Sequence, residues 1–189
     1  MKTIFAMLLF LFASAASAAE VAGVRVDDTA RVGGAELVLN GAGLRTRVFF
    51  KIYVAGLYLG ARKTAAAEVL ALAGPKRVSL RLMRELSAQQ LVEALEEGLR
   101  ENTPSAEQEA IKTRTVELSA TMLAVQTAKE GDIVALDFIP ASGTQVLLNG
   151  TPRGSPIAGE DFYRALLRIW LGDKPVSADL KKAMLGEGV

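Results

Sequence analysis

The segment from Leu39 to Gly60 constrains the fold more than any other part of the chain. Two glycines near its start, Gly41 and Gly43, predict a turn. Arg45 follows, and the sequence then runs on through Val, Phe, Ile, Tyr and Leu, which favour extended structure. This pattern predicts one long strand from Arg45 to Leu59, with an arginine at its beginning.

Arg45 is the first candidate for a functional side chain. An arginine that enters an apolar strand needs an anionic partner, because an unpaired buried charge is costly. The partner is either a ligand, which we favour, or a carboxylate of the protein such as Glu36 or Asp137. Tyr53 and Tyr58 lie five residues apart, so a regular strand places them on opposite faces of its sheet.

The remaining sequence predicts an α+β fold. Alternating polar and apolar residues predict a half-buried strand at 77–83, and Ser87 with Gln90 forms a capping box that begins a helix. Other strands are predicted at 21–26, 36–40, 132–139 and 145–148, and other helices at 64–73, from 104, at 161–171 and at 176–185. This order favours a mostly antiparallel sheet with helices packed on one face.

The N-terminus resembles a cleavable signal peptide over residues 1–18. Lys2 is followed by an apolar run, Ile4–Phe12, and by the small residues Ala16, Ser17 and Ala18. The apolar run is about half as long as a bilayer span requires, although a retained N-terminal anchor is an alternative. We therefore expect a single soluble domain, residues 19–189, that is exported to the periplasm, has no membrane span after cleavage and is a monomer.

Charge and composition argue against several classes of protein. The chain has 22 Lys and Arg against 21 Asp and Glu, so cleavage after residue 18 removes Lys2 and leaves a net charge of zero. A nucleic-acid partner is therefore not expected, because such proteins usually carry a basic face. There is no histidine and no cysteine. Histidine triads and disulfides are thus impossible, and we expect neither a metal nor a cofactor.

Four segments together resemble the chalcone isomerase-like superfamily. They are Gly41–Arg45 followed by Ala55–Leu59; Arg84–Ser87 at the start of a helix; Gly131–Val134 with Pro140 and Gly143-Thr144; and Trp170–Ser177. In this order they span most of the chain. The resemblance, which is to bacterial exported members of the superfamily, implies an open-faced β-sandwich with a ligand cleft between the long strand and the helices.

The resemblance also implies which residues line that cleft. In the plant enzymes, which close a chalcone to a flavanone, fixed donors stabilise a developing enolate. The matching positions here are Arg45 for the catalytic arginine, Tyr53 for a strand threonine, Leu91 and Gly98 for a helix tyrosine and asparagine, and Ile169 and Trp170 for two specificity residues. Arg45 is the only retained catalytic position. Leu91 and Gly98 offer no donor, so the resemblance predicts that catalysis is lost.

A fatty-acid-binding branch of the same superfamily holds a carboxylate with an arginine and a tyrosine. By analogy, Arg45 and Tyr53 are predicted to bind one carboxylate, and apolar cleft residues to surround an aliphatic tail. Eight residues of extended strand span about 26 Å, so sharing one anion requires the chain to fold back within Thr46–Lys51.

The sequence thus predicts a non-catalytic protein that binds a small amphipathic ligand such as a fatty acid. Two alternatives stay open. One is an isomerase of the intramolecular lyase type that acts on an enone. The other is a cell-envelope partner protein whose cleft is vestigial.

Overall fold

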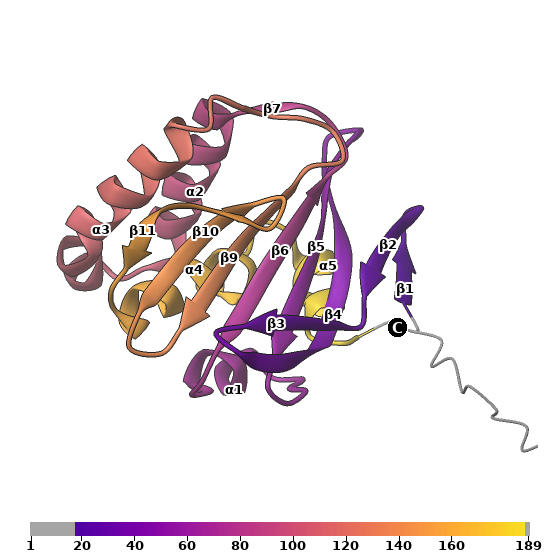
Figure 1. Cartoon of the computed structure of the whole chain (residues 1–189), viewed down its shortest axis with the longest axis horizontal. Coiled ribbons are helices and arrows are strands. Elements are labelled where there is room, and N and C mark those ends of the chain that lie inside the picture. Colours follow the sequence, from indigo (N-terminus) through magenta and orange to yellow (C-terminus); the bar gives the residue numbers. More distant parts are fainter. Residues whose placement is uncertain (1–17, 188–189) are drawn as a thin grey trace, which may run out of the picture.

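The computed structural model describes residues 18–187 and is built around a seven-stranded antiparallel sheet (Figure 1). The strand order is β11-β10-β9-β6-β5-β4-β3. The strands are β3 (Thr29–Val32), β4 (Ala35–Arg47), β5 (Phe50–Leu59), β6 (Lys76–Leu82), β9 (Ile133–Ile139), β10 (Gly143–Leu148) and β11 (Thr151–Ile157). The predicted signal peptide lies, apart from Ala18, outside the described residues and stays a prediction.

Within residues 18–187, two short antiparallel strand pairs and five helices complete the fold. The pairs are β1 (Ala18–Val21) with β2 (Val24–Asp27), and β7 (Leu86–Ser87) with β8 (Thr127–Ala128). The helices are α1 (Ala66–Ala71), α2 (Ala88–Asn102), α3 (Ser105–Leu123), α4 (Glu160–Leu171) and α5 (Ala178–Met184). The predicted α+β class is confirmed. No helix within residues 18–187 is both long and apolar enough to cross a membrane.

The sheet separates two hydrophobic clusters. The larger one lies between the sheet and the helices, and its members include Leu57, Leu82 and Trp170. The smaller one lies on the opposite face, where Val26 of β2 packs with Val54 and other strand residues. The helices therefore cover one face, as predicted, while the β1–β2 pair covers part of the other (Figure 1).

Local sequence signals explain several of these elements. Along β6, Val78, Leu80 and Leu82 belong to the larger cluster and the intervening residues are only partly buried, so the half-buried strand is confirmed. The capping box of α2 is also present. The Ser87 hydroxyl accepts a hydrogen bond from the Gln90 backbone N–H at 3.2 Å, and the Gln90 side chain accepts one from the Ser87 N–H at 3.0 Å.

The segment from Leu39 to Gly60 folds differently from the prediction made from its sequence. Gly41 and Gly43 do not form a turn but lie inside β4, and the chain turns at Val48 and Phe49 into β5. The predicted single strand from Arg45 to Leu59 is therefore wrong. The two glycines instead allow β4 to pack closely against α5. A Cβ on Gly43, for example, would lie only 2.6 Å from the Ala183 Cβ.

This packing predicts that Gly41→Ala is destabilising. A Cβ at Gly41 would collide with the backbone carbonyl oxygen of Ala183, and backbone cannot move aside cheaply. We expect a loss of about 1–3 kcal/mol in the free energy of unfolding, measured by urea denaturation. Gly60→Ala is the matched control, because a Cβ there meets nothing within 4 Å, and it should change stability by less than about 0.5 kcal/mol. Equal effects would contradict the packing argument.

Candidate functional site

The β4–β5 hairpin places Arg45 directly opposite Tyr53. The two residues are partners in the antiparallel register, and Thr46 pairs with Lys51 across a local irregularity. Side chains of directly opposed residues share one face of a sheet and lie close together. Tyr53 packs against the larger cluster, so this face is the one that the helices cover. The reversal required within Thr46–Lys51 is present, although that segment holds neither glycine nor proline.

Tyr53 is held in place by Trp170 of α4. The Trp170 indole N–H donates a hydrogen bond to the Tyr53 hydroxyl oxygen at 3.1 Å. Within residues 18–187 the hydrogen of that hydroxyl has no acceptor, so it is free to be donated outward. Donation from the indole also polarises the hydroxyl, which makes Tyr53 a better donor to an anion.

The guanidinium of Arg45 has no carboxylate partner among the described side chains. Its Nη1 donates a hydrogen bond to the Thr46 backbone carbonyl. Of the two carboxylates considered from the sequence, Asp137 instead binds Arg77 through two hydrogen bonds of 2.5 and 2.6 Å. Glu36 lies near the other end of β4 from Arg45, opposite Arg31 in the strand register. Arg45 therefore retains its charge and most of its donors for another anion.

Burial sets the ionisation of Tyr53. Desolvation raises its pKa, while the hydrogen bond from Trp170 and the positive charge of Arg45 oppose that rise. The phenol is therefore neutral at physiological pH. A neutral hydroxyl beside a guanidinium forms a donor pair for a carboxylate, in which Arg45 supplies the charge and Tyr53 one hydrogen bond.

The other predicted cleft residues lie in the helix layer above the same face. Ile169 and Trp170 are almost fully buried, and Leu91 of α2 is partly buried against the larger cluster. Gly98 marks the contact of α2 with α4, because a Cβ there would lie 2.8 Å from Ile169 Cγ2. Gly98 thus offers a ligand no side chain, and Ile169 fills the space above it.

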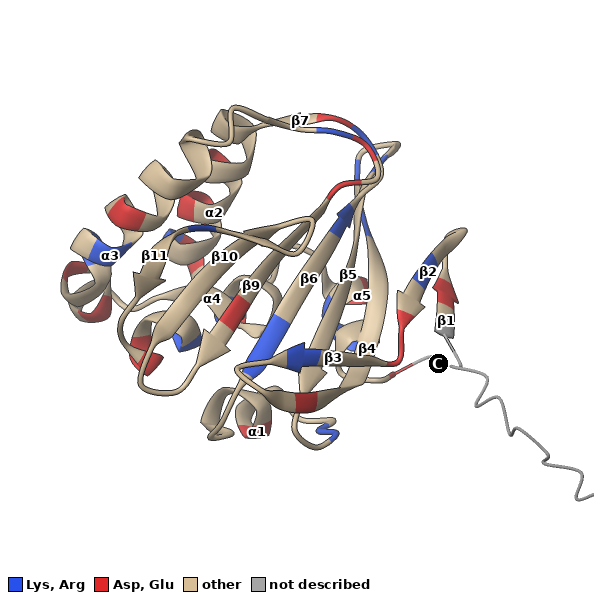
Figure 2. Ribbon diagram, in the orientation of Figure 1, with Lys and Arg blue, Asp and Glu red and all other residues tan. Residues whose placement is uncertain are grey.

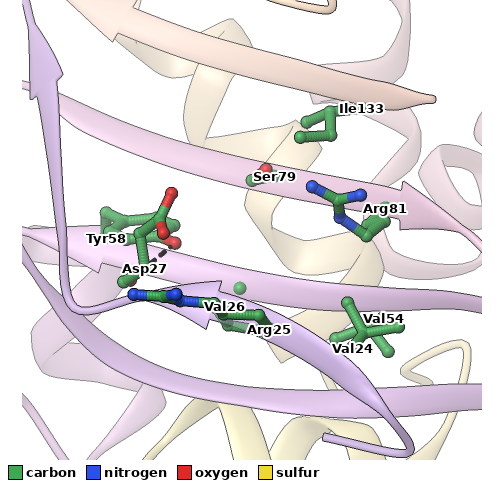
Figure 3. A pocket seen from close by; sticks show the side chains of 10 residues that line it. Val24, Arg25, Val26, Asp27, Val54, Tyr58, Ser79, Arg81 and Ile133 are labelled. Carbon is green, nitrogen blue, oxygen red and sulfur yellow. Dashed lines mark hydrogen bonds between the residues drawn. The ribbon is translucent and has the colours of Figure 1, made fainter. Parts of the chain in front are cut away.

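Two small cavities accompany these residues. One of about 20 Å³ is lined by apolar side chains, among them Leu91, Met122 and Val134, between α2, α3 and the sheet. The other, of about 50 Å³, lies on the opposite face beneath β2 (Figure 3). Ser79, Arg81 and Tyr58 are among its lining residues, and the Tyr58 hydroxyl donates to the Asp27 backbone carbonyl at 2.9 Å. Drug-sized ligands usually occupy about 300–1,000 Å³, so neither cavity accepts one without movement.

The fold and this arrangement of residues define a chalcone isomerase-like protein. The model of the chalcone isomerase-like family matches residues 18–186, so the chain belongs to that family. Among solved structures, the chain is similar to the fatty-acid binding protein AtFAP1 of Arabidopsis thaliana. The TM-score is 0.61 at 15% identity, covering 86% of this chain and 92% of that chain. This likeness confirms the predicted fold. A comparison with curated proteins finds no significant match.

The structure brings Arg45, Tyr53 and Trp170 together, whereas the sequence did not predict all of their contacts. Tyr53 and Tyr58 pack in different clusters and so lie on opposite faces, as predicted. Trp170 was expected to surround a ligand tail, whereas its indole also fixes the Tyr53 hydroxyl. No local signal could reveal this bond, because 117 residues separate its partners. Within residues 18–187 no cluster of acidic side chains is arranged to hold a metal ion.

The tyrosines predict a loss of stability at alkaline pH. All three, Tyr53, Tyr58 and Tyr163, are buried enough to raise their pKa, that of Tyr58 to about 12. Their phenols stay protonated in the folded state, whereas unfolded tyrosines ionise near 10. Stability should therefore fall as the pH rises above about 10. Lys76, whose pKa burial lowers, acts in the opposite direction.

Urea denaturation and phenolate absorbance, followed from neutral to alkaline pH, test this expectation. The urea concentration at the midpoint of unfolding should fall as the pH rises. Little phenolate should form until the protein unfolds. Tyr58→Phe removes one of the three groups and should make the decline shallower. Ordinary titration of all three tyrosines in a protein that stays folded would contradict the burial argument.

Proposed function

We propose that this protein binds a small amphipathic carboxylate, such as a fatty acid, through Arg45 and Tyr53. The observation that carries the proposal is the pairing of these residues across β4 and β5 on the helix-covered face. A guanidinium without a carboxylate partner and a hydroxyl with a free hydrogen then offer donors to one anion. The fatty-acid binding function of the structural neighbour AtFAP1 adds support at the level of the fold.

The apolar tail of such a ligand would extend beneath the helices. Leu82 pairs with Tyr53 on the next strand and belongs to the larger cluster, as does Val134, which lines the apolar cavity. These residues form an apolar path away from the carboxylate site. The cavity of about 20 Å³ is too small for a tail, so side chains must move. Leu91 is the side chain that we expect to move, because it is only partly buried and lines that cavity.

We also propose that the protein acts in the periplasm. The signal-peptide pattern in residues 1–18 supports export to the periplasm, where the cleaved protein would act without a membrane span. Retention of this pattern as an anchor is the alternative. Mass spectrometry of the protein from its native host distinguishes the two, because cleavage predicts a chain that begins at Ala19.

Binding of a fluorescent long-chain fatty acid tests the carboxylate site. Arg45→Gln removes the cation together with up to two charge-assisted hydrogen bonds, whereas Tyr53→Phe removes one hydrogen bond to the carboxylate, each such bond being worth about 1.5–3 kcal/mol. We therefore expect Arg45→Gln to raise Kd more than Tyr53→Phe. Arg31→Gln is the matched control, because Arg31 is an exposed arginine on β3.

A second ligand distinguishes the contribution of the head group to binding from that of the tail. The corresponding fatty alcohol lacks the carboxylate, so its weaker binding should be insensitive to Arg45→Gln. Equal and negligible effects of both site variants on fatty-acid binding would contradict the shared carboxylate site. Native mass spectrometry of the purified protein adds a direct readout of any acid that remains bound.

The small size of the cavities favours a second candidate, a partner protein with a closed cleft. In that case Arg45 and Tyr53 would bind an acidic group of another protein rather than a free acid. No fatty-acid binding, together with capture of a periplasmic protein that Arg45→Gln abolishes, would favour this candidate over the first.

We also predict no conversion of chalcone to flavanone above the spontaneous rate. Leu91 offers no hydrogen-bond donor, and Ile169 occupies the space in which a side chain at position 98 would lie. Loss of one oxyanion donor typically reduces the rate about 10²–10³-fold, and more than one is missing here. An absorbance assay with a chalcone measures this. Saturable turnover that disappears in Arg45→Ala would support the isomerase alternative instead.

A further inference from the structure

The tip of the β4–β5 hairpin exposes three consecutive apolar residues. The side chains of Val48, Phe49 and Phe50, here called the hairpin tip, are 79%, 93% and 60% exposed. The two-residue turn brings them to the end of the sheet, away from both hydrophobic clusters (Figure 1). Packing within the described fold therefore gives no reason for Val48 and Phe49 to be apolar, whereas the Phe50 ring contacts Arg84.

The backbone of the hairpin tip makes its sequence more unusual. Val48 has φ of 58°, in the left-handed region where a β-branched residue is strained. Two-residue hairpin turns with a positive φ at this position strongly favour glycine or asparagine. The chain instead places valine there and phenylalanine next to it. Strain combined with exposed apolar side chains indicates a function for the tip rather than a requirement of folding.

Cationic side chains surround the hairpin tip. Arg47 and Lys51 flank it on the two strands and are exposed. Arg84, from the connection between β6 and β7, lies with its guanidinium carbon 4.9 Å from the centre of the Phe50 ring. Residues 45–51 include no acidic residue. Acidic side chains lie on the neighbouring connections, where Glu85 follows Arg84 and Glu130 and Asp132 flank Gly131, whose backbone N–H bonds to Leu82, whereas the hairpin itself carries only cations from residue 45 to residue 51 (Figure 2).

We propose that the hairpin tip docks on the surface of a membrane that contains anionic phospholipids. Phe49 and Phe50 would enter the boundary between head groups and acyl chains, as apolar residues of peripheral proteins do. Arg47, Lys51 and Arg84 would remain at the level of the phosphates, to which each basic residue near the surface is attracted. An apolar tip within a cationic rim matches such a surface in both polarity and charge.

Docking in this manner would also orient the candidate carboxylate site. Arg45 lies three residues before Val48, a distance of about 10 Å along a strand. The site would thus face the head-group region, where an amphipathic acid can enter. The membrane proposal does not depend on this consequence, because vesicle binding is measured without any fatty acid and can succeed or fail by itself.

Flotation of the protein, lacking residues 1–18, with phosphatidylglycerol vesicles tests the proposal. We expect binding that weakens as salt is added and that is much lower on phosphatidylcholine vesicles. Phe49→Ser should reduce the partition coefficient about 10- to 100-fold, the effect expected for one buried phenylalanine. Val116→Ser, at a 63% exposed apolar residue of α3, is the matched control and should leave binding unchanged.

Two further measurements make the result decisive. Arg47→Gln should lower binding to the anionic vesicles roughly fivefold without affecting the phosphatidylcholine background. Phe49→Trp should give a fluorescence component that shifts to shorter wavelength with vesicles, whereas buried Trp170 in the parent protein should not respond. Thermal melts check that each variant is folded.

Three outcomes would overturn the proposal. The first is absence of binding to anionic vesicles, and the second is binding that Phe49→Ser does not weaken. The third is a dimer in solution that Phe49→Ser dissociates, because the hairpin tip would then be the contact between two copies of the chain.

Discussion

The pairing of β4 with β5 is the constraint on which the rest of the structure depends. It runs from Val38 opposite Leu59 to Arg47 opposite Phe50 and forms the most extensive strand contact of the sheet. This register turns an arginine and a tyrosine eight residues apart into direct neighbours. The same register leaves the connecting residues, Val48 and Phe49, beyond the end of the sheet. The candidate carboxylate site and the hairpin tip are thus two consequences of one chain reversal.

The two sides of this pairing are stabilised by different contacts. On the helix side, Gly43 allows α5 to approach β4, and Ala55 opposite it belongs to the larger cluster. On the other side, Val54 and Tyr58 pack beneath the β1–β2 pair. Because both faces of the hairpin are packed along most of its length, its position is well defined. Arg45 and Tyr53 are therefore carried on rigid strands, although side chains above them must move to admit a ligand.

The helix layer determines which polar groups remain at the candidate site. Gly98 and Ile169 bring α2 and α4 into close contact, which leaves no room for an additional polar side chain. Trp170, from the same helix as Ile169, fixes the Tyr53 hydroxyl instead. The remaining polar groups, a cation and one neutral donor, are those on which the proposed binding of a carboxylate depends. The residues around them are apolar.

The sequence by itself determined the α+β class, the helices, the half-buried strand β6 and the resemblance to the chalcone isomerase-like family, because these follow from periodicity, capping and local motifs. It also singled out Arg45 and Tyr53. Only the tertiary structure decided where the chain reverses, because Val48 and Phe49 carry none of the usual turn residues and the reversal is imposed by packing on both faces. For the same reason the sequence misplaced a turn at Gly41 and Gly43, whose partner, α5, lies far along the chain. The bond from Trp170 to Tyr53 likewise depends on contacts between distant segments, which no local pattern encodes.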